Sequence, residues 1–178
     1  MGGEPIWAPS QDEIAAAGVS HFARWLAEDG RARLTGDYLE LWRWSTERLE
    51  EFWAAVWDYF GVRSAVPYER VLSGSVMPDV QWFAGARVSY VEHLFRGRDP
   101  ARVALIDIRE SAQGPVSGHL TWGMLRAQVA SLAAMLRDLG IGPGDRVAGY
   151  VPNTAEAVIA FLATASLGAI WSGCGQDS

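Results

Sequence analysis

Residues 121–178 decide the fold, and they read TWGMLRAQVASLAAMLRDLGIGPGDRVAGYVPNTAEAVIAFLATASLGAIWSGCGQDS. Leucine and valine recur at helical spacing from Leu125 to Leu139, which predicts a helix with one apolar face. The glycine-rich run Gly140–Asp145 predicts the turn that ends this helix. The apolar run 146–151 then predicts a strand.

A second helix and a second strand follow this first strand. Asn153, with Glu156 three residues on, predicts the start of the helix, and Gly168 predicts its end. Residues 169–174 can return as a strand. A strand, a helix and a strand in this order predict a βαβ unit, which buries its faces inside a larger parallel sheet. The fold class is therefore α/β.

The glycine-rich run GIGPGD at 140–145 invites comparison with a phosphate-binding loop. Such a loop follows a strand and precedes a helix, whereas this run follows a helix and precedes a strand. The Gly-Lys-Ser/Thr ending of a phosphate loop is also absent. We therefore expect a structural turn, with Asp145 fixing it.

The first 60 residues predict a helical, tryptophan-rich segment. Capping-box pairs mark helix starts at Ser10 and Asp37, and Ser20 predicts a further start. Apolar side chains then recur on one face of a helix over about 46–60. They are Leu49, Phe52, Trp53, Val56, Trp57 and Phe60.

The middle of the chain has a weaker pattern. Residues 62–88 carry scattered Pro and Gly and predict an irregular connector, with Trp82 and Phe83 as anchors. Ser89 with Glu92 predicts another helix start, running to about residue 96. Beyond it, 103–108 predicts a strand and 113–118 a loop or turn.

Composition limits the possible functions. The chain has 178 residues and a net charge of −6, which disfavours a nucleic-acid surface. All 15 basic residues are arginine, so no step that requires a lysine ammonium can be carried out by this chain. The apolar stretch 157–171 is shorter than the ~20 residues that span a membrane. The start of the chain has no signal-peptide pattern, so we expect a cytoplasmic protein without a membrane partner.

The residues that most often carry chemistry show no catalytic or metal-binding spacing. His21, His93 and His119 lie far apart, and none pairs with Cys174 at a ligand spacing. Cys174 is expected to be a small buried residue at a strand end. Among the tryptophans, Trp42, Trp44, Trp53 and Trp57 are expected to pack in a core, with a stacking platform for sugars as the alternative.

Three further stretches make a resemblance specific. They are WAPS at 7–10, EEFWAAVWDYFGV at 50–62 and MPDVQWFAGARVSYVEHL at 77–94. Together with 121–178, they resemble the acetoacetyl-CoA synthetases, a family of adenylate-forming acyl-CoA synthetases. The resemblance implies that residues 1–98 are the helical extension found in acetyl- and acetoacetyl-CoA synthetases. Residues 99–178 would be the first, incomplete part of the AMP-binding adenylating domain.

The resemblance also implies a reaction and its ligands. The full-length family uses ATP, Mg and CoA to convert acetoacetate to acetoacetyl-CoA, with AMP and pyrophosphate as products. Its phosphate loop and catalytic lysine correspond to no part of this sequence, so we expect an N-terminal fragment with no catalytic or metal site, inactive alone. The segment that borders CoA in related synthetases maps onto Gly173, Cys174, Gly175, Gln176 and Asp177.

Two other functions remain open. The chain could be a self-standing interaction module derived from a truncated synthetase, associating with itself through an unfinished sheet. It could also be a carbohydrate-binding helical domain.

Overall fold

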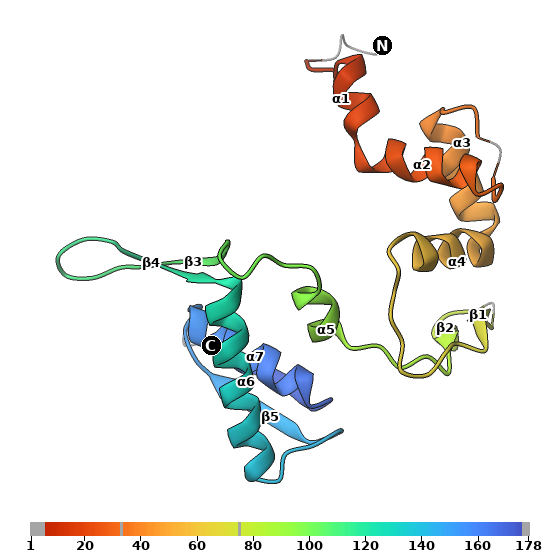
Figure 1. Cartoon of the computed structure of the whole chain (residues 1–178). Coiled ribbons are helices and arrows are strands. Elements are labelled where there is room, and N and C mark those ends of the chain that lie inside the picture. The colour runs from red at the N-terminus through yellow and green to blue at the C-terminus, as the bar shows by residue number, and fades with distance from the viewer. Residues whose placement is uncertain (1–5, 33, 75, 176–178) are drawn as a thin grey trace. The chain divides into compact units, whose positions relative to one another are not determined.

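The computed structural model of the chain describes residues 6–32, 34–74 and 76–175. It divides into two compact units, Met1–Val88 and Ser89–Ser178, here called the first and second units. Within the described residues, the first unit holds four helices and a two-stranded sheet, and the second holds three helices and two such sheets (Figure 1). Helices and small sheets together confirm the expected α/β class.

The first unit begins with four helices, which confirms the helical segment expected from the sequence. They are α1 (Gln11–Ala16), α2 (Gly18–Glu28), α3 (Tyr38–Glu47) and α4 (Leu49–Tyr59). The capping box at Ser10 forms as predicted. The Ser10 N–H donates to Glu13 Oε2 at 2.7 Å, and the Glu13 N–H donates to Ser10 Oγ at 3.3 Å.

The two other predicted caps differ from the expectation. Ser20 lies inside α2, where its N–H donates to the carbonyl of Ala17, and so it is not a cap. Ala17 is the residue at which α1 ends and α2 begins. Asp37 does cap α3, accepting from the Leu39 N–H at 3.0 Å. Glu40 does not complete a box there, because its carboxylate accepts from the N–H of Thr35 instead.

Aromatic rings build most of the core of the first unit. Phe22 and Leu26 of α2 are buried with Leu41 of α3 and Ala55 of α4. Around them, Trp25, Trp44, Phe52 and Tyr59 pack as half-buried rings.

Two more tryptophans of α4 contact the hairpin. Trp57 lies 4.5 Å from the ring of Phe83 and 5.1 Å from that of Tyr68, between ring centroids, and Trp53 lies 5.6 Å from Trp82. Packing is therefore the role of the half-buried Trp57, as expected, whereas Trp53 is 38% exposed and Trp42 is 52% exposed, so the expectation that these two lie in a core was wrong.

The expected irregular connector contains regular structure. β1 (Arg70–Ser73) and β2 (Gln81–Ala84) pair antiparallel, with Leu72 opposite Trp82. The backbone of Phe83 has a φ of 48°, which is unusual for a residue other than glycine, and its ring packs against those of Trp57 and Tyr68. The prediction of a wholly irregular segment was wrong, whereas the prediction of Trp82 and Phe83 as anchors is confirmed.

The described part of the second unit has seven helices and strands. They are α5 (Tyr90–Phe95), β3 (Val103–Arg109), β4 (Val116–Thr121), α6 (Trp122–Asp138), β5 (Arg146–Tyr150), α7 (Ala155–Ser166) and β6 (Ile170–Cys174). β3 and β4 form an antiparallel ribbon, so the expected loop at 113–118 is partly strand. β5 and β6 come before and after α7 in the sequence and pair in parallel with each other, which confirms the βαβ unit.

The core of the second unit lies between its helices. Eight buried side chains form it: Val91, Phe95, Leu125, Val129, Ala133, Ile159, Leu162 and Ala163. Two arginines close one end of this core. The Arg126 guanidinium donates to the carbonyl of Phe95 at 2.7 Å, and Nε of Arg98 donates to the carbonyl of Leu94 at 3.1 Å. Cations at the last carbonyls of a helix are stabilising, so these arginines fix the end of α5.

The run Gly140–Asp145 is the structural turn that its position predicts. Gly140 and Gly144 have φ values of 88°, a region that favours glycine. The carboxylate of Asp145 accepts from the N–H of Gly142 at 2.8 Å and so fixes the turn. This confirms the structural interpretation over a phosphate loop.

The start of α7 depends on the distant strand β3. The N-cap is Thr154, not the predicted Asn153, and its side chain makes no capping bond to the helix. Instead, the backbone N–H of Ala155 donates to the carboxylate of Asp107 on β3. Arg109 then joins the two elements, with its Nε 2.8 Å from Asp107 and its Nη2 2.6 Å from Glu156.

This cluster predicts an acid sensitivity of the second unit. The hydrogen bond from Arg109 lowers the pKa of Asp107, and the hydrogen bond from the Thr154 side chain lowers that of Glu156. A carboxylate with a lowered pKa stabilises the fold above its unfolded-state pKa and loses that contribution as pH falls through the folded-state value. The stability of the unit should therefore decline below about pH 4. In thermal unfolding across pH, Asp107→Asn should flatten this decline, and parallel curves for the two proteins would contradict the assignment.

Candidate functional site

The carboxyl ends of β5 and β6 form the candidate site. These strands are parallel, and Tyr150 lies opposite Cys174 at their ends. In open parallel sheets, ligands bind beyond the carboxyl ends of the strands. The segment expected to border CoA begins here: Gly173 and Cys174 end β6, and Gly175 follows, all three exposed. Gln176 and Asp177 lie outside the described residues.

A tryptophan explains two glycines near this strand end. Gly149 lies opposite Gly173 in the register, and Trp171 packs beside both. A Cβ at Gly149 would lie 2.3 Å from Cη2 of Trp171, and one at Gly173 would lie 3.2 Å from its Nε1. Glycine in a strand often marks such a close approach. The indole ring therefore occupies space that any side chain at Gly149 would need.

Gly149→Ala should consequently disturb the site. The new methyl group must displace the Trp171 ring or shift β5, and overpacking of this kind costs about 1–3 kcal/mol. Chemical denaturation would measure the loss, and the tryptophan fluorescence of the native state should change with it. Gly142→Ala is the control, because a Cβ there has nothing within 4 Å. Equal stability of the two variants would show that the position of the Trp171 indole does not require a glycine at residue 149.

Cys174 is exposed, so the expectation of a buried cysteine was wrong. Within the described residues, β6 pairs with β5 and with no strand on its other side. A residue at the end of such an edge strand remains open to solvent. The described part of the strand end therefore offers backbone groups, a thiol and the indole of Trp171, a surface that can border a ligand.

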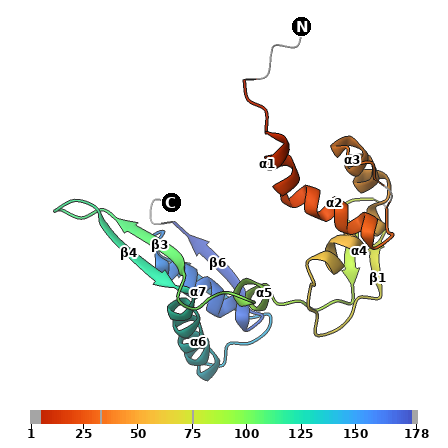
Figure 2. The ribbon, with the colours of Figure 1, turned by 45° about the horizontal axis from the view of Figure 1, so that its top comes forward.

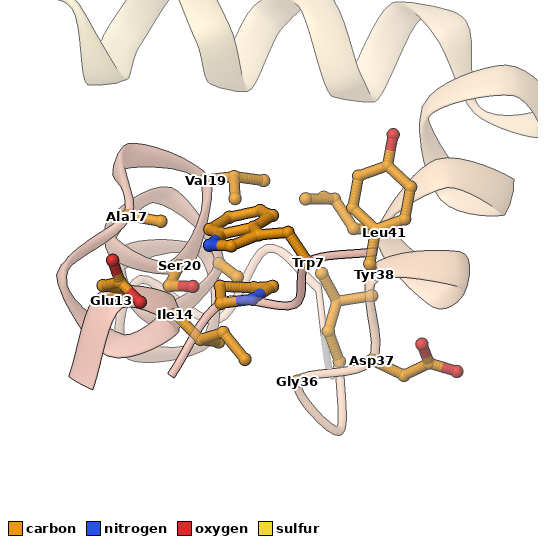
Figure 3. A pocket seen from close by; sticks show the side chains of 13 residues that line it. Trp7, Glu13, Ile14, Ala17, Val19, Ser20, Gly36, Asp37, Tyr38 and Leu41 are labelled. Carbon is orange, nitrogen blue, oxygen red and sulfur yellow. The ribbon is translucent and has the colours of Figure 1, made fainter. Parts of the chain in front are cut away.

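The first unit holds a second candidate site, a hollow of about 400 Å³ between α1, α2 and the start of α3 (Figure 3). Its lining is mainly apolar, and Trp7 lies among Ile14, Val19 and Leu41. Two carboxylates, Glu13 and Asp37, also line it, but both already cap helices. The hollow can accept an apolar group. The sequence did not predict it, because its walls come from segments that carry no common pattern.

Among the described residues, no three His, Cys, Asp or Glu side chains converge so as to hold a metal ion. No helix in those residues has the length and apolar character needed to cross a membrane.

Two family models match the chain side by side. Residues 38–94 match the acetyl-coenzyme A synthetase N-terminus, and residues 95–177 match the AMP-binding enzymes. The junction of the two models falls at the end of α5. The model of the AMP-binding enzymes thus includes both the βαβ unit and the candidate site at the end of β6.

Individual relatives narrow the family. The chain is 37% identical to the acetoacetyl-CoA synthetase of Xenopus tropicalis over 99% of its own length and 26% of that protein. It is 43% identical to the Mus musculus acetoacetyl-CoA synthetase over 80% of its length and 21% of that protein.

A solved structure agrees with these relatives. The acetoacetyl-CoA synthetase from Streptomyces lividans matches 98% of this chain with a TM-score of 0.86 and 44% identity, over 27% of that structure. The chain thus spans about a quarter of the length of the relatives it matches. Two adjoining family models, the relatives and the solved structure all agree, and the chain belongs to the acetoacetyl-CoA synthetase family of AMP-binding enzymes.

Proposed function

We propose that this chain forms the opening section of an AMP-forming acetoacetyl-CoA synthetase and has no ligase activity alone. The complete enzyme would convert acetoacetate, ATP and CoA to acetoacetyl-CoA, AMP and pyrophosphate in the cytoplasm. The observation that carries the proposal is the match to the Streptomyces lividans enzyme over 98% of the chain.

Within that enzyme, the chain's contribution would be scaffold and one ligand-bordering segment. We assign Gly173, Cys174, Gly175, Gln176 and Asp177 to the route of CoA. The position of the first three at the carboxyl end of a parallel strand supports this assignment, as does their exposure. Glycine has no side chain, so a ligand can approach the backbone closely at Gly173 and Gly175.

The groups that activate acetoacetate would have to lie elsewhere. Transfer of an adenylyl group depends on positioned charges, among them metal ions and cationic side chains that hold the phosphates. The family's phosphate-loop lysine and catalytic lysine cannot come from this chain, because its 178 residues contain no lysine. This absence supports the proposed inactivity of the chain alone.

Two forms of the protein test the proposal. The first is the purified chain, assayed for acetoacetate-dependent exchange of pyrophosphate into ATP. The second is a chimera in which the chain replaces the part of the Streptomyces lividans enzyme that it matches. We expect exchange from the chimera and none from the chain. Exchange by the chain alone would overturn the proposed inactivity, and a chimera without activity would overturn the proposed place in the enzyme.

An interaction module is the second candidate function. Exposed apolar side chains on β3 favour it, since Ile106 and Ile108 are 70% and 69% exposed. Sedimentation separates the two functions: a defined oligomer of the isolated chain favours a self-associating module, whereas a monomer favours the enzyme section.

A further inference from the structure

A hollow runs along one edge of β3. It has a volume of about 320 Å³, and four consecutive residues of the strand line it: Leu105, Ile106, Asp107 and Ile108. Successive side chains of a strand point to opposite faces. A hollow lined by all four therefore lies along the edge of the strand and not under one of its faces.

The backbone along this edge has no strand beside it in the described residues. β3 pairs with β4 and with no other strand there. A free strand edge presents N–H and C=O groups that can pair with another strand. A two-stranded ribbon is also marginally stable by itself, and it gains stability from a third strand. The edge of β3 is thus able to take a further strand.

The opposite wall of the hollow is the start of α7. Asn153, Thr154, Ala155 and Val158 line it, and Figure 2 shows β3 beside this helix. The carboxylate of Asp107 already accepts from Ala155 and pairs with Arg109. An occupant therefore need not supply a cap for the helix or a partner for Asp107. An occupant would therefore contact the free edge of β3 and the apolar side chains that line the hollow.

An extended segment is the occupant that fits a strand edge. A lone segment of about four residues, ~13 Å long, matches the lined part of β3. The relatives extend well beyond the part that this chain matches, since the chain spans 26% of the Xenopus tropicalis protein, and we take the segment from that remainder.

We propose that the hollow between β3 and α7 takes an extended apolar strand from the part of the synthetase that lies outside this chain. The strand adds to the free edge of β3 and covers Ile106 and Ile108. This inference rests on the proposed function, since it takes the occupant from the complete enzyme. The mode of binding is strand addition, in which backbone hydrogen bonds hold the segment and side chains select it.

Hydrogen exchange provides the first test. Alternate amides of β3 already face β4, so those of residues 105–108 that point away from it should exchange at least 10-fold more slowly in the chimera described above than in the isolated chain. An active chimera with unchanged exchange at these amides would overturn the strand addition and leave the proposed function intact. Protection of the same amides in a dimer of the isolated chain would also overturn it, because the occupant would then be a second copy.

Substitution on the ribbon provides the second test. Lysine on an edge strand opposes pairing with a further strand. Ile108→Lys in the chimera should therefore lower the rate of pyrophosphate exchange into ATP at least 10-fold. It should also remove the slowing of hydrogen exchange at the β3 amides. The matched control is Val116→Lys: Val116 is 58% exposed on β4 and does not line the hollow. In the isolated chain, both substitutions should leave the unfolding midpoint unchanged, because both side chains are exposed there. Equal activity of the two chimeras would contradict the inference.

Discussion

Replacing Leu162 with alanine is expected to lower the free energy of unfolding of the second unit by about 3–4 kcal/mol. Leu162 is 2% exposed and belongs to the core between α6 and α7. Shortening it removes buried apolar contacts and leaves a cavity that the helices can close only in part. The loss is a large share of the stability of an ordinary domain. Hydrogen exchange would locate this loss of stability, because the backbone amides of α6 and α7 should exchange faster.

The control for this change is Leu139→Ala. Leu139 is 71% exposed at the end of α6, so the same truncation should change the free energy of unfolding by less than about 0.5 kcal/mol. The first unit has its own core around Leu26. Protection of α2 and α4 should therefore persist in Leu162→Ala. A uniform loss of protection in both units would show that the two cores unfold together.

The features that were predicted correctly from the sequence depend on residues close to one another in the chain. Ser10 and Glu13 are three residues apart, and their reciprocal hydrogen bonds need only the first turn of α1. The turn at Gly140 follows from the order of helix, glycines and strand, and the Asp145 bond that fixes it spans three residues. Such features are set before any tertiary contact forms.

Features that depend on distant residues were missed. The hairpin of β1 and β2 joins residues on either side of Gly74 and Pro78, which in sequence read as breaks. The start of α7 is satisfied from β3 by Asp107, so Asn153 is not needed as a cap. Periodicity reports which face of an element is buried but not which element lies against it.

The candidate site was predicted only by resemblance. No residue pattern marks Gly173–Gly175 as a ligand segment, and the register that sets Gly149 opposite Gly173 is visible only in the folded βαβ unit. The same holds for the hollow beside β3, whose two walls are about 45 residues apart in sequence.

Trp57→Ala is expected to destabilise the first unit by about 3 kcal/mol. The side chain is half-buried and packs against two rings, with centroid distances of 4.5 Å to Phe83 and 5.1 Å to Tyr68. Removing it would leave the hairpin of β1 and β2 without its main contact with α4. Chemical denaturation would measure the loss, and exchange should speed up in β1 and β2.

Trp42→Ala is the matched control and also tests the carbohydrate alternative. Trp42 is 52% exposed on α3, so its loss should change the free energy of unfolding by less than about 0.5 kcal/mol. If tryptophans served as a sugar platform, the exposed Trp42 would carry binding and Trp57 would affect it through folding alone. A glycan-binding signal that Trp42→Ala abolishes without loss of stability would favour the platform. Because the Trp57 ring packs against those of Tyr68 and Phe83, we expect a large loss of stability on changing Trp57 and no loss of stability or of glycan binding on changing Trp42.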